Sequence, residues 1–128
     1  MDPQHALQQL GVGEEDMPAA LSGLAIEAYR SYERTGSKRD IDLAVISAQA
    51  AVAITKEGDL DRVSRINNLG VMLESRYKRT GAMADLEEAI GVARQAVAAT
   101  PDDHPDRAGC LNNLGNKLES RYDDRGVS

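Results

Sequence analysis

Apolar residues recur every three or four positions along most of the chain, and the first such series follows Pro18. Its members are Leu21, Leu24, Ala25, Ala28 and Tyr32. That spacing places them on one face of an α-helix, and Gly36 follows where a C-terminal glycine is typical. A second apolar series then runs from Ile41 to Val52, with Asp40 positioned to cap its start. The pattern therefore predicts two consecutive helices joined by a tight turn.

The same pattern returns 45 residues later, together with much of its sequence. Asn112-Asn113-Leu114-Gly115 repeats Asn67-Asn68-Leu69-Gly70, and Thr80-Gly81 repeats Thr35-Gly36. A fixed period of this size is typical of stacked helical repeats, in which each unit packs only against its neighbours. The sequence therefore predicts an all-α fold, an α-solenoid of antiparallel helical hairpins with five main helices.

The period divides the chain into repeats at 18–60 and 61–105, a partial repeat at 106–126, and a tail at 127–128. In the second repeat, Asp85 and Glu88 have the spacing of a capping box at the start of a helix. In the third, five residues are expected to point inward: Leu111, Leu114, Gly115, Leu118 and Tyr122. The third repeat lacks a second helix, which suggests a fragment of a longer array or an end that is covered by self-association.

The N-terminal segment, residues 1–17, is less regular. Ala6, Leu7 and Leu10 fit one apolar helix face, and Gly11 and Gly13 end it. We interpret residues 3–10 either as a short helix, standing where the second helix of a preceding repeat would lie, or as a frayed tail.

Composition narrows the class of partner. The net charge of -6 argues against nucleic acid and anionic membranes, because both need a basic surface. The chain begins without a secretory signal, and no apolar stretch reaches the roughly 18 residues of a membrane span. The single cysteine, Cys110, cannot form an internal disulfide, which favours a reducing, cytoplasmic location.

Residues 61–105 resemble a tetratricopeptide repeat. The residues that carry the resemblance are Ile66, Leu69-Gly70, Leu73, Ala89, Ala93, Ala96 and Pro101. The period is 45 residues instead of about 34. This longer form is similar to arrays of fungal and actinobacterial proteins that accompany a caspase-like CHAT protease domain or an NTPase domain, and to kinesin light chain repeats. The resemblance extends over residues 18–126 and implies a right-handed α-solenoid, with Gly70 and Ala89 at a close approach of two helices.

The resemblance further implies that the first helices line a concave groove, whose candidate peptide-binding residues are Asn67, Asn112, Asn68, Asn113, Val71, Asn116, Glu74 and Arg30. An asparagine amide both donates and accepts hydrogen bonds, so it suits a peptide backbone. We favour this role for Asn67 and Asn112. For Asn68 and Asn113, a hydrogen bond within the array is an equal alternative.

Other polar residues are better explained by architecture. Arg76 and Arg121 stand near helix ends, where cations are favourable. Arg62 and Arg107 follow an aspartate and are expected to form ion pairs between repeats. The periodic tyrosines are expected to pack, and Cys110 to be a small core residue. The spacing of histidines and cysteine fits no metal site, and no catalytic motif is present.

The sequence therefore predicts a non-enzymatic interaction module without a metal or cofactor. It would bind a peptide or protein segment in the groove and act as a scaffold or sensor arm of a larger protein. The alternative is an oligomerisation module that forms a homodimer through the unpaired third-repeat helix.

Overall fold

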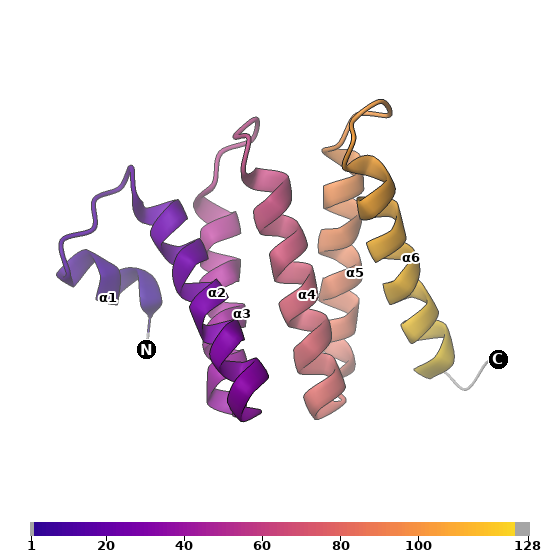
Figure 1. Ribbon diagram of the computed structural model, residues 1–128, viewed down its shortest axis with the longest axis horizontal. Helices are drawn as coiled ribbons and strands as arrows, with labels where there is room; N and C mark the ends of the chain where they lie inside the picture. The colour runs from indigo at the N-terminus through magenta and orange to yellow at the C-terminus, as the bar shows by residue number, and fades with distance from the viewer. Residues whose placement is uncertain (1, 125–128) are drawn as a thin grey trace. The chain divides into compact units, whose positions relative to one another are not determined.

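The computed structural model describes residues 2–124, which form six α-helices and no strand (Figure 1). The helices are α1 (Pro3–Gln9), α2 (Met17–Thr35), α3 (Lys38–Ile54), α4 (Arg62–Thr80), α5 (Met83–Ala98) and α6 (Arg107–Asp124). The predicted all-α helical-repeat fold, with five main helices and a short N-terminal one, is confirmed. The chain divides into two compact units, Met1–Arg65 and Ile66–Ser128, and each is described by itself.

In the first unit, α2 and α3 form an antiparallel hairpin. The turn between them depends on Gly36, whose φ of 68° is left-handed and whose N–H donates to the Tyr32 carbonyl at 2.7 Å. The two helices bury the predicted apolar faces against each other, and the buried residues are Leu21, Ala25, Ala28, Ile41, Ala44, Val45, Ala48 and Ala51. Small alanines on both faces let the helices lie close together.

The short helix α1 is also present, so the N-terminal segment is not a frayed tail. Leu7 and Val12 pack against a buried cluster of Met17, Leu21 and Ala51 in the hairpin. Leu10, however, is 81% exposed, so its predicted place on the apolar face is wrong. The reason is local: Leu10 is the C-cap of α1, where the chain leaves the helix.

In the second unit, α4 and α5 form the matching hairpin, and α6 packs against both. Gly81 repeats the turn of Gly36, with a φ of 77° and an N–H that donates to the Tyr77 carbonyl at 2.7 Å. The buried face of α5 consists of Leu86, Ala89, Ile90, Val92, Ala93 and Ala96. The two hairpins thus share both the turn and the apolar pattern predicted from the repeat.

The predicted helix caps at Asp40 and Asp85 are wrong. The N-caps of α3 and α5 are Ser37 and Ala82, and neither makes a capping hydrogen bond through a side chain. Each aspartate instead lies in the first turn of its helix and accepts hydrogen bonds from the preceding helix. Asp40 accepts from Ser31 Oγ at 2.8 Å and Thr35 Oγ1 at 2.9 Å, and Asp85 accepts from the Arg76 guanidinium. The carboxylates therefore tie the two helices of each hairpin together.

The apolar face of α6 is only partly covered, contrary to the prediction. Leu111 and Tyr122 are 47% and 49% exposed, and Gly115 is exposed as well. Within residues 2–124 no second helix follows α6, whereas α5 covers the corresponding face of α4. The residues that α6 does bury are Cys110 and Lys117.

Candidate functional site

Helices α4 and α6 are each the first helix of a repeat. They lie side by side in the second unit and run in the same direction (Figure 1). Three contacts along their length establish this arrangement: Asn67 with Cys110, Gly70 with Lys117, and Tyr77 with Asp124. The partners are 43 and 47 residues apart, close to the 45-residue period, so the two helices are nearly in register. Equivalent residues of successive repeats therefore come close together on this surface.

Asn67 is already engaged within the unit. Its Nδ2 atom donates to Cys110 Sγ at 3.5 Å, a weak hydrogen bond because sulfur is a poor acceptor. Cys110 is 1% exposed and also lies 3.7 Å from Thr100 Oγ1. The thiol is thus a small buried residue between helices, as predicted. Asn67 therefore serves, at least in part, to join α4 to α6.

Asn112, the equivalent residue on α6, is exposed instead. Asn116 lies one helical turn after both Asn112 and Asn113, because residues three and four positions apart are neighbours on a helix. We refer to these three residues as the α6 amide cluster. Within residues 66–124 their side-chain amides make no hydrogen bond, and neither does that of Asn68 on α4. The two asparagines that the sequence treats alike, Asn67 and Asn112, thus differ in the structure.

The remaining candidates are Val71 and Glu74 on α4 and Arg30 on α2. Val71 is 39% exposed, and Glu74 is half-buried. Arg30 lies on α2 in the first unit, where it pairs with Glu27 at 3.2 Å, and both side chains are exposed. The structure therefore brings the α4 and α6 candidates into one unit and leaves Arg30 in the other.

Lys117 is a buried cation that the sequence analysis missed. It is 3% exposed, and its Cε atom lies 3.4 Å from the place that a Cβ of Gly70 would occupy. Burial lowers the pKa of the Lys117 ammonium, while the nearby Glu74 carboxylate opposes that shift. A signal was available: 45 positions earlier stands Met72, which is also 3% exposed, so Lys117 occupies a core position.

Gly70 lies at a close approach of helices, as predicted. A Cβ there would be 3.5 Å from Val92 Cγ2 on α5, in addition to its contact with Lys117 on α6. Both distances are ordinary van der Waals contacts. α5 and α6 thus both approach α4 at Gly70, and a Cβ at this position would fit between them without a clash.

The arginines are structural, and the ion pair between repeats predicted for Arg107 is present, because its Nη1 lies 3.5 Å from Asp102 Oδ1. Arg76 forms an ion pair with Asp85, and Arg121 pairs with Glu87 at 3.2 Å. Arg107 donates to the carbonyl oxygens of Thr100 at 2.6 Å and Val97 at 3.2 Å, which satisfies the C-terminal end of α5. The ion pair expected for Arg62 is absent from residues 2–65, where its buried Nε has no hydrogen-bond partner.

Tyr77, which was expected only to pack, also makes a hydrogen bond. Its hydroxyl donates to Asp124 Oδ1 at 2.6 Å. That hydrogen bond raises the pKa of the Tyr77 phenol, because the neutral form is the donor and a carboxylate stands beside it. The bond fastens the end of α6 to α4.

Known proteins provide an independent comparison. The sequence profile of a tetratricopeptide repeat family matches residues 62–106. The chain contains a tetratricopeptide repeat. The tetratricopeptide repeat begins at the start of α4 and includes all of α5, so it corresponds to the hairpin fastened by Arg76 and Asp85. Comparisons with curated proteins and with solved structures found no match.

Tetratricopeptide repeats generally mediate protein–protein interactions and are typically not enzymes. Among residues 2–124, no three histidine, cysteine, aspartate or glutamate side chains are grouped to hold a metal ion. Across the same range, every helix is too short or too polar to cross a membrane. The similarity to CHAT-associated arrays and kinesin light chain repeats stays a prediction.

Proposed function

We propose that this tetratricopeptide-repeat protein binds an extended segment of a partner protein, and that the α6 amide cluster provides the main polar contacts. The side-chain amides of Asn112, Asn113 and Asn116 carry the proposal, since they have no hydrogen-bond partner within residues 66–124. Asn112 and Asn116 are exposed, and Asn113 is half-buried. Each amide can donate to a peptide carbonyl and accept from a peptide N–H. Asn68 and Val71 on α4 would extend the surface with one further amide and an apolar contact.

The charge around the cluster favours a neutral or basic segment. Glu119 and Asp123 are exposed on α6, and Lys117 is buried. A strongly acidic segment would therefore meet repulsion here, since like charges at short range disfavour binding. Asn67, which already bonds Cys110, is expected to contribute less to binding than Asn112.

The test uses a peptide selected against the full chain from a display library of unstructured sequences, labelled with a fluorophore. The double variant Asn112→Ala/Asn116→Ala should weaken binding of this peptide roughly thirtyfold, given about 1 kcal/mol for each of two lost hydrogen bonds. The matched control is Gln95→Ala, which removes an exposed amide from α5. Fluorescence anisotropy measures both. Equal affinities for the double variant and the wild type would exclude the cluster as the binding site.

A second candidate function is self-association through α6. The partly exposed face of Leu111 and Tyr122 supports it, because the equivalent Ile66 on α4 is fully buried. Sedimentation velocity over a wide concentration range is the measurement. A dimer that the Leu111→Glu variant abolishes would support this function, and a wild-type chain that stays monomeric at high concentration would rule it out.

A further inference from the structure

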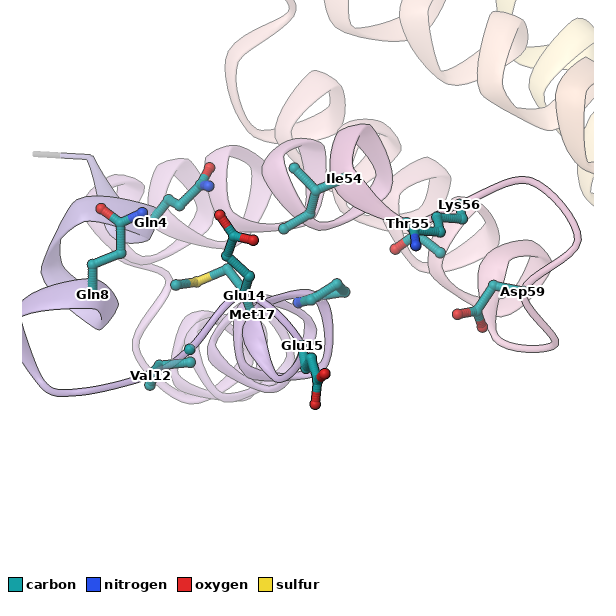
Figure 2. Close-up of a pocket in the computed structure, with 12 residues that line it drawn as sticks. Gln4, Gln8, Val12, Glu14, Glu15, Met17, Ile54, Thr55, Lys56 and Asp59 are labelled. Carbon is teal, nitrogen blue, oxygen red and sulfur yellow. The ribbon is translucent and has the colours of Figure 1, made fainter.

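The first unit contains a cavity of about 730 Å³ between α1, the loop before α2 and the end of α3. Figure 2 shows Gln4 and Gln8 on α1, Glu14 and Met17 near the middle, and Lys56 and Asp59 toward the other end. Its volume is in the range of roughly 300–1,000 Å³ that is usual for ligand sites. All of its described lining residues belong to the first unit, so it shares no residue with the α6 amide cluster.

Part of the cavity wall is apolar. Met17 is 3% exposed and belongs to the buried cluster of the hairpin, and Val12 and Ile54 pack against that cluster. These side chains are held in place by the same packing that docks α1 on α2 and α3. An apolar group entering the cavity would therefore meet a preformed surface.

The rest of the wall is mainly acidic. Among the described residues that line the cavity, Glu14, Glu15 and Asp59 are acidic and Lys56 is the one cation. Neither glutamate forms an ion pair within residues 2–124, and Asp59 Oδ1 accepts only from the backbone N–H of its neighbour Asp61, at 2.8 Å. The cavity therefore has an excess of two negative charges, which favours a cationic ligand.

An exposed apolar residue stands beside this acidic wall. Leu60, which directly follows Asp59, is 97% exposed. It packs against nothing that would explain a leucine at this point of the loop. A partner that reaches beyond the cavity would cover it, which points to a ligand longer than a single small amine.

We propose that this cavity binds a basic amphipathic segment of a partner protein. An apolar side chain of the segment occupies the space against Met17 and Ile54. A neighbouring arginine or lysine pairs with Glu14 or Glu15, and the amides of Gln4 and Gln8 supply hydrogen bonds to the backbone of the segment. This site adds to the proposed function, because none of its residues belongs to the α6 amide cluster.

The experiment uses the full chain and a labelled, N-acetylated peptide of alternating arginine and leucine as the probe. Two further probes carry glutamate in place of arginine or serine in place of leucine. The test variant is Glu14→Gln/Glu15→Gln, and the matched control is Glu33→Gln/Asp103→Asn, which removes the same charge from exposed positions elsewhere. Circular dichroism confirms that each variant keeps its helices.

We expect the arginine–leucine probe to bind the wild type, with the test variant weakening it roughly three- to tenfold and the control leaving it within twofold. Both altered probes should bind more weakly, and free arginine should not compete at the probe concentration. The proposal is overturned by equal weakening in the two variants, because attraction would then arise from the net charge alone. Equal binding of the serine probe, or efficient competition by free arginine, would also overturn it. Neither result depends on the amide cluster, so the two proposals fail independently.

Discussion

Arg76 and Asp85 form a two-point ion pair that joins α4 to α5. Arg76 Nη2 lies 2.8 Å from Asp85 Oδ1, and Arg76 Nε lies 3.0 Å from Asp85 Oδ2. Asp85 is only 8% exposed, so its charge depends on this partner. In the first repeat the equivalent residues are Ser31 and Asp40, which are joined by a hydroxyl hydrogen bond. The same link between helices is thus made with different chemistry in the two hairpins.

Removing the guanidinium should destabilise the second unit. Arg76→Ala leaves the Asp85 carboxylate largely buried without its partner, which should cost roughly 2 kcal/mol of unfolding free energy. Arg121→Ala is the matched control, since Arg121 occupies the same repeat position but pairs with the exposed Glu87, and should cost roughly 0.5 kcal/mol. Urea denaturation followed by circular dichroism measures both. Equal losses would contradict the stronger role assigned to Arg76.

Replacing the buried cation should stabilise the chain. Lys117→Met places at this position the residue that the preceding repeat already has, and should raise the unfolding free energy at pH 7 by about 1 kcal/mol. Lys56→Met, on an exposed position of the first unit, is the control. A loss of stability in Lys117→Met would show that the ammonium is needed where it lies.

The advantage of Lys117→Met should shrink as pH rises. Burial lowers the pKa of Lys117 below its usual 10.5, so between the two values the unfolded chain binds more protons than the folded one. The stability contributed by this position in the wild type therefore increases with pH over that window. Denaturation of both proteins at pH 7 and pH 10 measures the difference. A difference in unfolding free energy between the two proteins that is the same at both pH values would contradict the lowered pKa of Lys117.

Two glycine substitutions should act in opposite directions. Gly81 has a φ of 77°, which alanine adopts at a cost, so Gly81→Ala should destabilise by about 1 kcal/mol. Gly115 lies within α6, and a Cβ there would meet nothing within 4 Å. Gly115→Ala should therefore stabilise by up to about 1 kcal/mol through helix propensity. Thermal denaturation gives the sign of each change, and the same sign for both would contradict this account.

Cys110 should be protected from thiol reagents in the folded chain. Cys110 lies on α6, is 1% exposed and contacts Asn67 on α4 and Thr100. Reaction of its thiol therefore requires the helices to separate. An aromatic disulfide reagent should react slowly under native conditions and fully in denaturant. Asn67→Ala should accelerate the native reaction severalfold if its contact helps to hold α6 in place, whereas Asn112→Ala should not. Rapid modification of the native wild type would contradict the packing described.

Much of the fold follows from sequence alone. The apolar spacing of α2 and α4 and the glycines after them are local signals, and each acts over a few residues. These signals predicted the two helical hairpins and the turns at Gly36 and Gly81. Asp85 was misassigned because the capping-box pattern is equally local, whereas its partner Arg76 lies on the previous helix. Where a side chain has two available partners, the packing of the helices determines which partner it bonds.

The sequence by itself determined the repeat, its helices and the resemblance of residues 61–105 to a tetratricopeptide repeat, because these depend on periodicity and on turn glycines. Only the tertiary structure decided which of two identical asparagines is engaged. Asn67 has α6 beside it and bonds Cys110, whereas Asn112 has no such neighbour within residues 66–124. Equal sequence positions acquire different roles because their surroundings come from other helices.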